Sequence, residues 1–493
     1  MSKQVIVVGS GLAGLTCAMD LLDEGFEVTV LEAGAIPGGR TSNWDENGME
    51  VESGFHKYIG FYSELPKLLE RAGINLGEML TWETTLEIRL PDQEEEEGAV
   101  FGLAPGRSPF KAIAGVLGNN DFLSPSDKMS LIPFMSAGLK DYTDNPEELD
   151  RYTVAEYAQK HGVNPEAIRH ILEPLTAGVL FLPPERYSAL VFFGIFAPGV
   201  PGFYKMKIGA FNGGMYDVMI HPIIHAITAR GGKLRTLSRV SELISDGNQV
   251  IGVRIGEEEL LADHVVVATN MHGAKLLLAQ QFSGHNWFED FLEMPMMSDI
   301  TVQVETSKRL MELDRTTFAP GTCIGSFTEQ SQTTFKHVPG RLSFILTPPE
   351  RFIDLSDEEV FSIFLQDAKR IGLNIEDVLL DYRVIRMKDH FHTVEPGHAW
   401  RRPAQKTPIP GLTLAGDYTY QAMFTTMEGA VISGHWAAEA ITGKGKERKP
   451  RAENPNPDAL TDHVVRAPDM LGRAAAESAP LDTPERFIGR KDG

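Results

Sequence analysis

The alternation of apolar and polar stretches is clearest at the start of the chain. Residues 5–8 are four β-favouring apolar residues, and they run directly into Gly9-Ser10-Gly11-Leu12-Ala13-Gly14. Residues 15–23 are typical of a helix, which Gly25 ends. Residues 27–31 are again rich in β-favouring residues. This pattern predicts a strand, a helix and a second strand, with a glycine-rich turn where the first strand meets the helix.

The rest of the chain mixes strand and helix patterns. We expect helices at residues 65–73, 153–162 and from Met215 to about residue 231, and strands at 82–90, 233–243, 250–255 and 262–270. Thr153 and Glu156 have the spacing of a capping box. The buried strand at 262–270 returns the chain to the first sheet, so the region between is inserted. Residues 444–493 lack sustained periodicity, which predicts a mostly disordered tail.

Two regions between residues 105 and 204 are amphipathic or strongly apolar. Within 105–142, apolar residues recur at helical spacing in two segments, and we expect Pro133 to kink or interrupt the second. This region has a local excess of basic residues, although the net charge of the chain is −22. The basic bias suits a patch that lies on a membrane surface, but two core-facing helices fit the periodicity equally well. Residues 177–204, which prolines interrupt, line a long apolar cavity or fill a core.

Composition limits the classes of function. A length of 493 residues favours two intertwined domains. The net charge of −22 argues against a nucleic-acid partner, because phosphate binding needs a basic face. The two cysteines, Cys17 and Cys323, exclude a disulfide framework and a cysteine-rich metal site. We expect no signal or transit peptide before the first strand, and no run of ~18 apolar residues suggests a membrane span.

The glycine-rich turn has the spacing of a dinucleotide-binding fingerprint. Gly9 allows the tight turn, Gly11 lets the backbone approach a pyrophosphate, and Gly14 lets the helix pack on the strand. The N-terminus of the helix offers free N–H groups and a positive dipole to phosphates. Glu32, at the end of the second strand, is placed to accept hydrogen bonds from ribose hydroxyls. The alternative is a helix that merely packs tightly on a strand.

A second glycine turn, Pro-Gly-Gly-Arg-Thr-Ser at residues 37–42, follows closely. Here the sequence resembles the flavoprotein family of amine oxidases and carotenoid desaturases, whose members carry a Gly-Gly-Arg turn at this place. Two glycines permit close backbone approach, and Arg40 supplies a bidentate donor for phosphate. The alternative is a glycine turn with a surface arginine.

The C-terminal part carries a matching pair of motifs. Residues 412–419 form a predicted strand that ends in Gly416-Asp417, and residues 426–434 open a helix. In the family, the equivalent Asp binds the ribityl–pyrophosphate part of FAD, and N–H groups at the helix start meet the flavin ring. Together these segments resemble the plant and cyanobacterial type of phytoene and ζ-carotene desaturases.

That resemblance covers roughly residues 5–442. It extends to residues 52–56, 60–62, 105–123 and 402–409. It implies that the basic amphipathic region docks on a membrane and that a hydrophobic tunnel admits a C40 polyene. The chain departs from the family at residues 210–214, in the acidic run 94–97, and at Lys57, where an apolar residue is expected.

The motifs and the resemblance give a set of expected site residues. The expected cofactor-binding residues are Gly9, Ser10, Gly11, Leu12, Ala13, Gly14, Glu32, Ala33, Gly39, Arg40, Thr41, Val240, Gly416, Asp417 and Met427. His56 is the candidate catalytic group near the flavin ring, with a hydrogen-bonded structural histidine as the alternative. Phe55 and Arg402 are expected to bind substrate. Arg402 marks a tunnel mouth or a quinone site, or else makes a surface salt bridge.

The predicted fold class is α/β, with a Rossmann-type FAD-binding domain, an interleaved α+β substrate domain and a membrane-associating helical region. The expected parts are FAD-binding at 1–90, substrate and membrane region at 91–208, FAD-binding at 209–297, substrate domain at 298–404, FAD-binding at 405–443 and tail at 444–493. The resemblance implies desaturation of a long polyprenoid, such as phytoene or ζ-carotene, by hydride transfer to flavin N5. A quinone is then expected to reoxidise the flavin, and the protein to be cytoplasmic and peripheral on the inner membrane face.

Other functions fit the same motifs. A flavin amine oxidase, a squalenoid dehydroxylase and a carotene isomerase would use the same cofactor site. A prenyl-lipid carrier would share the fold without redox chemistry, but it has no need for a full flavin-binding motif set. His390, His392 and His398 show no clear ligand geometry, so no metal site is expected.

Overall fold

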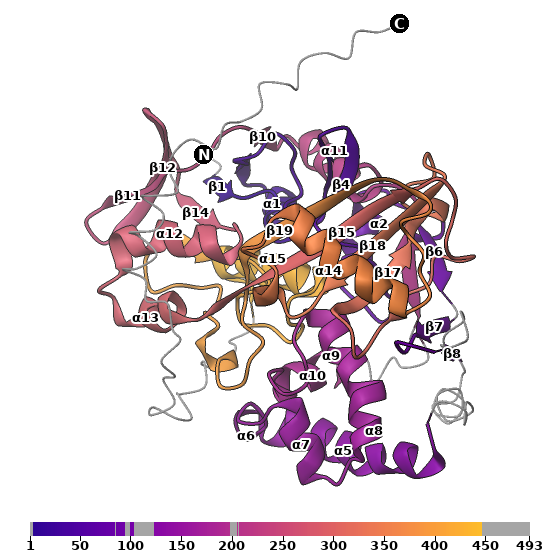
Figure 1. Cartoon of the computed structure of the whole chain (residues 1–493). Coiled ribbons are helices and arrows are strands. Elements are labelled where there is room, and N and C mark those ends of the chain that lie inside the picture. Colours follow the sequence, from indigo (N-terminus) through magenta and orange to yellow (C-terminus); the bar gives the residue numbers. More distant parts are fainter. Residues whose placement is uncertain are drawn as a thin grey trace, which may run out of the picture.

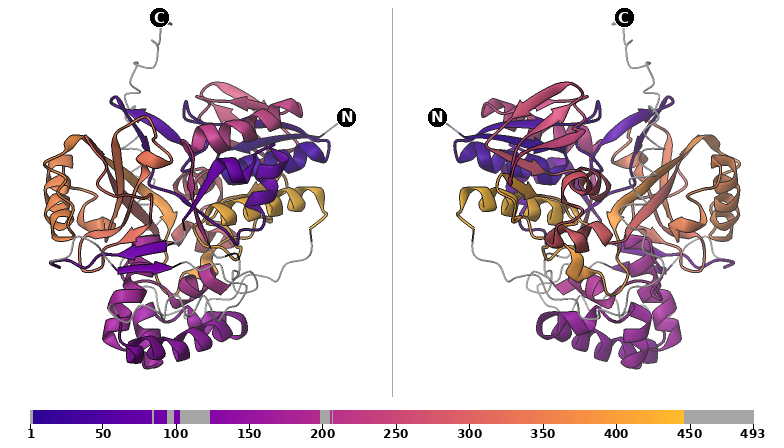
Figure 2. Two further views of the ribbon diagram at one scale, coloured as in Figure 1. Left: turned by 90° about the vertical axis from the view of Figure 1, so that its right-hand side faces the viewer. Right: turned by 90° about the vertical axis from the view of Figure 1, so that its left-hand side faces the viewer.

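The structure is a computed structural model of the chain, and it describes residues 3–83, 85–93, 99–102, 123–197, 205 and 207–445 (Figure 1). A five-stranded parallel sheet lies beside a seven-stranded mixed sheet. A helical unit packs beneath both sheets in the orientation of Figure 1, and the two further views in Figure 2 agree.

The parallel sheet has the strand order β10-β2-β1-β14-β20. Its strands are β1 (Gln4–Val8), β2 (Glu27–Leu31), β10 (Lys233–Arg235), β14 (His264–Val267) and β20 (Leu412–Leu414). The chain therefore enters this sheet three times, and N-terminal, central and C-terminal segments meet in one layer. The predicted return of the chain at residues 262–270 is confirmed, because β14 pairs with β1.

Both faces of this sheet are apolar and covered, as a parallel sheet requires. One face carries α1 (Leu12–Asp23), α2 (Leu65–Arg71), α11 (His221–Ala229) and α15 (Met427–Thr442). The other carries α12 (Met271–Phe282), α13 (Asn286–Glu293) and a meander of β11 (Glu242–Asp246), β12 (Gln249–Ile255) and β13 (Glu258–Leu261). The π-helix η3 (Tyr216–Ile220) leads into α11.

The mixed sheet has the strand order β19-β15-β18-β17-β16-β7-β8. Its strands are β7 (Thr85–Ile88), β8 (Ala99–Gly102), β15 (Met296–Thr306), β16 (Thr317–Phe318), β17 (Ile324–Glu329), β18 (Gly340–Leu346) and β19 (Leu379–His392). The pairing of β16 with β7 is parallel and the other pairings are antiparallel. Helix α14 (Asp357–Arg370) buries its apolar side against this sheet.

Small elements connect the two sheets. They are the hairpin β3 (Asn43–Glu46) and β4 (Met49–Glu52), the sheet β5 (Lys57–Ile59), β9 (Ile208–Phe211) and β6 (Leu80–Glu83), the helix α3 (Leu76–Met79), and the 3₁₀ turns η4 (Gln330–Gln332), η5 (Pro349–Arg351) and η6 (Ala399–Arg401).

The helical unit, magenta in Figure 1, holds a core that is rich in aromatic rings. Its helices are α5 (Pro125–Asp144), α6 (Pro146–Leu149), α7 (Val154–Lys160), α8 (Pro165–Ala167), η1 (Ile168–Leu172), α9 (Glu173–Leu180) and α10 (Ala189–Phe196). We call the buried rings Phe134, Tyr157, Phe181, Tyr187, Phe192, Phe193 and Phe424 the aromatic cluster. The rings of Phe55 and Phe391, from outside this unit, pack against it.

Several predicted elements need correction. The single strand expected at 82–90 is two strands, β6 and β7, in different sheets. The strand expected at 233–243 is also two, β10 and β11, because the intervening residues pass beside Glu32 and Gly34. Pro133 does not interrupt α5, which runs from residue 125 to 144. The capping box of Thr153 and Glu156 is confirmed.

Other predictions fall where the structure gives no description. They concern the amphipathic segment before residue 123, the acidic run at 94–97, and the tail beyond residue 445. Within the part of the chain that the structure describes, no helix is both long and apolar enough to cross a bilayer.

Candidate flavin-binding site

The glycine-rich turn after β1 has two packed glycines and one open glycine. An ideal Cβ on Gly9 would lie 2.6 Å from the Ala268 carbonyl oxygen, and one on Gly14 would lie 2.1 Å from the Gly9 oxygen. A Cβ on Gly11 would meet nothing within 4 Å. Gly11 is also the N-cap of α1, and no side chain caps the free N–H groups there. The turn thus presents bare backbone donors on an open face, which suits a pyrophosphate.

Glu32 lies at the end of β2 and binds the same turn. Its Oε2 accepts hydrogen bonds from Ser10 N at 3.1 Å and Ser10 Oγ at 2.5 Å. Its Oε1 accepts a hydrogen bond from Gly34 N at 2.8 Å, just beyond Ala33. The carboxylate is therefore held at the edge of the open face, where ribose hydroxyls are recognised in this type of fold.

The second glycine turn is tied to the first. Gly38 N donates to Ser10 Oγ at 3.2 Å, and Thr41 Oγ1 donates to Gly38 O at 2.8 Å. An ideal Cβ on Gly39, whose φ is +58°, would lie 3.6 Å from the Gly11 Cα. The fold therefore brings Gly39 against the fingerprint, and its role in cofactor binding stays a prediction.

Arg40 joins the N-terminal and C-terminal motifs. Its Nη2 donates to Asp417 Oδ1 at 2.7 Å, across 377 positions of sequence. Burial opposes the ionisation of Asp417, but the attraction of Arg40 outweighs it and lowers the pKa of this carboxyl. The Arg40 guanidinium also lies 4.4 Å from the centroid of the Phe391 ring. The alternative of a simple surface arginine is therefore wrong.

Gly416 and Asp417 are held by α15 and by Arg402. Gly416 N donates to Ser433 Oγ at 2.8 Å. Arg402 is 1% exposed, and it donates to the carbonyl oxygens of Asp417 at 3.0 Å and Gln421 at 3.0 Å. The alternative of a surface salt bridge for Arg402 is wrong, because the side chain is buried and binds backbone oxygens. Its substrate contact remains a prediction.

Met427 and Val240 pack in the apolar cores on opposite faces of the parallel sheet. Met427 is the first residue of α15 and is buried, next to the N-cap Thr426, whose Oγ1 accepts from Gly429 N at 3.0 Å. Val240 is half-buried on the meander side of the parallel sheet. The segment before it runs beside Glu32, whose carbonyl oxygen accepts from Ser238 N at 2.8 Å.

Sequence reasoning missed the role of Glu428. Its carboxylate is 3% exposed and accepts hydrogen bonds from Ser63 N, Glu64 N and Leu65 N at 2.7, 2.8 and 2.8 Å. These are the free donors at the start of α2. A side chain from the last helix thus caps an early helix, which no local sequence pattern could reveal.

His56 follows β4 in an extended segment. Its Nδ1 donates to the Gly54 carbonyl oxygen at 2.8 Å. Burial lowers the pKa of His56 to about 4, against a smaller opposing effect of that hydrogen bond, so the ring is neutral at neutral pH. The adjoining Phe55 packs against the aromatic cluster. Its position fits both the predicted catalytic role and the structural alternative.

The charge of Arg40 acts on two further histidines and on one carboxyl group. Burial is the main cause that lowers the pKa of His390 and of His392 to about 4 each. Asp299, on β15, is also buried and within reach of the Arg40 charge. Sequence reasoning missed Asp299, because β15 also holds Ser298, Gln303 and Glu305 and nothing local sets Asp299 apart from them.

The unusual Lys57 is explained by two buried carboxylates. Its ammonium forms ion pairs with Glu83 and with Asp314, the latter at 2.7 Å. The attraction of both carboxylates outweighs the burial of Lys57 and raises its pKa. A charged residue can therefore occupy a position where an apolar one was expected.

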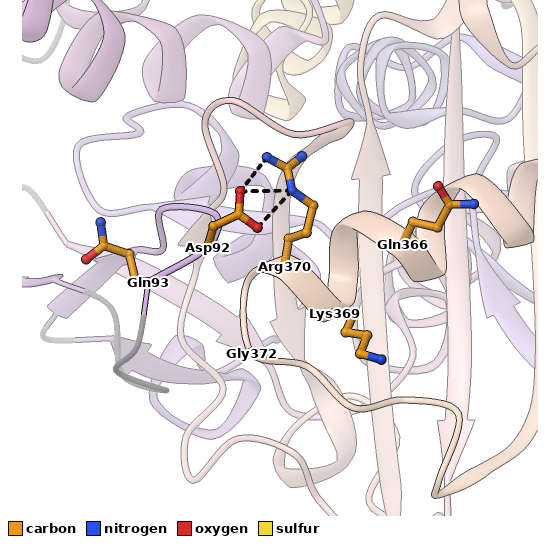
Figure 3. Close-up of a pocket in the computed structure, with 6 residues that line it drawn as sticks. All are labelled: Asp92, Gln93, Gln366, Lys369, Arg370 and Gly372. Carbon is orange, nitrogen blue, oxygen red and sulfur yellow. Dashed lines mark hydrogen bonds and ion pairs between the residues drawn. The ribbon is translucent and has the colours of Figure 1, made fainter.

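Two other features lie apart from this site. A surface hollow of about 430 Å³ is lined by Asp92, Arg370 and neighbours at the end of α14, where those two residues form an ion pair at 2.9 Å (Figure 3). None of its lining residues belongs to the parallel sheet. Among the described residues, no group of three His, Cys, Asp or Glu side chains is arranged to hold a metal ion.

The arrangement defines a flavin-binding protein, and comparison with known proteins agrees. The chain belongs to the family of flavin-containing amine oxidoreductases, which it matches over residues 12–442. The open face over Gly11, the Glu32 carboxylate and the Arg40–Asp417 pair fit FAD. The predictions of an FAD-dependent oxidoreductase and of an α/β flavoprotein fold are confirmed.

Relatives of known function share about a quarter of the sequence. The 15-cis-phytoene desaturase of Synechococcus elongatus is 26% identical over 474 residues, which cover 91% of this chain and 98% of the relative. The zeta-carotene desaturase of Synechocystis sp. is 27% identical over 475 residues, which cover 89% and 97%.

Solved structures show the same fold. An oxidoreductase from Methanosarcina mazei superposes with a TM-score of 0.68 at 19% identity, covering 88% of this chain and 99% of that one. Putrescine oxidase bound to putrescine gives a TM-score of 0.67 at 15% identity, with 90% and 99% covered. At these identities the likeness concerns the fold alone.

Proposed function

We propose that this protein desaturates a long hydrophobic polyprenoid, a carotene such as phytoene or ζ-carotene, by oxidising adjacent CH groups. We further propose that a quinone reoxidises the cofactor and that the protein works at a membrane surface. The names of the relatives, phytoene and zeta-carotene desaturases, support the substrate class.

One observation carries the proposal. The Arg40 guanidinium pairs with Asp417 on one side and lies over the Phe391 ring on the other. Phe391 packs against the aromatic cluster of the helical unit. The cofactor motifs therefore end directly on a large apolar core, which suits an apolar chain better than a polar substrate.

The residues that would hold FAD come from four segments. The turn around Gly11 and the N-terminus of α1 would bind the pyrophosphate, Glu32 would bind the ribose, and Arg40 and Asp417 would hold the pyrophosphate and ribityl region. Bound FAD supplies a two-electron acceptor for the hydride that the substrate loses.

The remaining work falls to the chain itself. Desaturation needs an oriented substrate and the exclusion of water. Buried rings such as Phe181 and Phe424 supply an apolar surface, and Phe55 extends it toward His56. His56 and His392 are neutral, so they add polar contacts without bringing positive charge beside a substrate that loses hydride.

The test is a spectral assay on the purified protein with its flavin. We would add liposomes that contain phytoene or ζ-carotene, with a quinone, in the absence of air. Bleaching of the flavin and a new polyene band at longer wavelength would support the proposal. A flavin that carotenes do not reduce, but that amines or squalenoids reduce, would refute the substrate class and leave the family assignment intact.

A further inference from the structure

Asp299 is a buried carboxyl group that the described part of the protein leaves incompletely paired. It is 4% exposed, and its Oδ1 has no hydrogen-bond partner among the described residues. A buried polar atom without a partner costs free energy, and a catalytic role is one explanation for such a group.

The face of β15 that carries Asp299 also faces the segment before His56. Gln303 Nε2 donates to the Glu52 carbonyl oxygen at 2.5 Å. Two residues earlier, Thr301 packs at Gly54, where an ideal Cβ would lie 3.2 Å from its Cγ2.

Strand alternation puts residues 299, 301 and 303 on one face of β15. Going from Gln303 to Thr301, the contacted residue moves forward from Glu52 to Gly54, so the two segments run antiparallel. Asp299 is thus directed toward Phe55 and His56. A register shift between Met297 and Asp299 separates this face from the preceding part of the strand.

Asp299 also lies where the cofactor motifs meet the apolar core. Arg40 acts on its charge, although the ion pair of Arg40 goes to Asp417 at 2.7 Å. Met297, two residues before, is part of the buried core of the helical unit and pairs across the sheet with Phe391. An unsatisfied carboxyl oxygen therefore lies beside both the flavin-binding residues and the apolar surface.

We propose that Asp299 is the proton acceptor in the active site, an inference that rests on the proposed desaturation. One C–H bond of the substrate breaks with its electron pair, and this hydride goes to the oxidised flavin. The adjacent C–H bond then breaks, its electron pair forms the new C=C bond, and its proton goes to Asp299 Oδ1. The substrate loses two electrons and two hydrogens in total, and the proton leaves Asp299 for solvent before the next turnover.

The ionisation of Asp299 suits this task. Burial raises the pKa of Asp299 to about 8, although the attraction of Arg40 opposes the rise. A base works best when its pKa lies near the operating pH. Arg40 is the charged group that acts on Asp299. The charge of Arg40 also acts on three neutral histidines and one ionised carboxylate, namely His56, His390, His392 and Asp417.

The experiment compares Asp299→Asn with Asp389→Asn in the full-length flavoprotein. Asp389→Asn is a matched control, because it makes the same chemical change on the adjacent strand β19. The backbone φ of residue 389, +54°, is one that Asn tolerates. We expect Asp299→Asn to lower the rate of carotene-dependent flavin bleaching by about 100-fold or more, and to abolish its rise with pH. Asp389→Asn should keep the rate and the pH profile.

A second readout does not depend on turnover. Infrared difference spectra across neutral and alkaline pH should show a carbonyl band of a protonated carboxyl that disappears as pH rises. Glu52 and Asp150 contribute to this band too, because burial raises the pKa of Glu52 to about 8 and that of Asp150 to about 7. The Asp299 component, seen as the difference between parent and variant, should be lost in Asp299→Asn, retained in Asp389→Asn, and shifted in Asp299→Glu. Asp299→Glu should also recover part of the rate, and it serves as the second variant if Asp299→Asn loses flavin.

The outcomes separate this inference from the proposed function. Unchanged rate and pH profile in Asp299→Asn, or no titrating carboxyl band in the parent protein, would overturn the role of Asp299 alone. If the parent flavoprotein does not convert carotenes, the proposed function fails, and the role of Asp299 as acceptor of a carotene proton fails with it.

Discussion

Replacing Glu428 by Gln should loosen the start of α2 from a distance of more than 360 positions in sequence. The Glu428 carboxylate accepts three backbone N–H groups, from Ser63, Glu64 and Leu65, and also the Ser63 hydroxyl at 3.0 Å. A Gln amide has one oxygen, so at least one of these donors would face an NH₂ group instead. The variant therefore removes one or two hydrogen bonds to a charged acceptor.

The magnitude follows from those contacts. A hydrogen bond to a charged group contributes about 1.5–3 kcal/mol, and a favourable charge at a helix N-terminus adds about 0.3–1 kcal/mol. We expect Glu428→Gln to cost about 2–4 kcal/mol locally. Because 1.4 kcal/mol corresponds to a factor of ten, the amides of Ser63 to Leu65 should exchange with solvent roughly 30-fold to 1,000-fold faster.

Hydrogen exchange by mass spectrometry on peptides that span residues 61–72 measures this effect. Glu64→Gln is the control, since it removes the same charge from the same helix start at an exposed ion pair with Lys67. That change should stay within about 0.5 kcal/mol. If both variants exchange alike, Glu428 does not cap α2 and the reasoning is refuted.

Three further predictions concern the site and its supports. Gly11→Ala should fold normally but bind FAD at least about tenfold more weakly. Gly14→Ala should instead destabilise the fold, because its Cβ would meet the Gly9 oxygen at 2.1 Å. Equal flavin content and equal melting temperature in the two variants would contradict these expectations. Burial lowers the pKa of five histidines, His56, His264, His390, His392 and His398, from 6.5 to about 4, so the unfolded state binds more protons in that window. The contribution of these rings to stability should therefore be complete above about pH 6.5 and fall toward pH 4, by up to ~1.4 kcal/mol per histidine per pH unit. Urea unfolding at a series of pH values, compared between the parent and a variant that replaces one of these histidines, isolates this contribution from the opposite effect of Glu52, Asp150 and Asp299, whose pKa burial raises; a difference that does not change with pH would show that the ring is accessible to protons in the folded state. Lys57→Met should lower the free energy of unfolding by about 3–5 kcal/mol, because it leaves the Glu83 and Asp314 carboxylates without their cation. Lys67→Met on the surface should lower it by under about 0.5 kcal/mol. An equally small loss of stability in Lys57→Met would mean that the buried carboxylates find other partners.

The local features of the fold could be predicted because they rest on local patterns. The strand at residues 27–31, the capping box at Thr153 and the start of α15 depend on residues that are close in sequence. The break between β10 and β11 could not be predicted, because backbone hydrogen bonds to Glu32 and Gly34 draw that segment away from a continuous strand. An interruption at Pro133 was one of two predicted effects and is wrong, because α5 accommodates this proline within 20 continuous residues; the predicted kink stays a prediction.

The residues of the candidate site also fall into those that local motifs reveal and those that only long-range contacts reveal. The turns that hold Gly11 and Arg40 carry motifs and were found, whereas Asp299 and Glu428 act through contacts with residues far away in sequence. Their burial and the direction of their side chains depend on the packing of β15 and α15. Such information is absent from any window of sequence around either residue.

The pairing of Arg40 with Asp417 also sets an order of events during synthesis. Because 377 positions separate the two residues, a ribosome adding about 5–20 residues per second completes the second half of the pair roughly 20–75 s after the first. During that interval β20 and α15 are missing from the parallel sheet and from the apolar face of α1. The nascent chain therefore keeps this layer open until β20 and α15 have been synthesised.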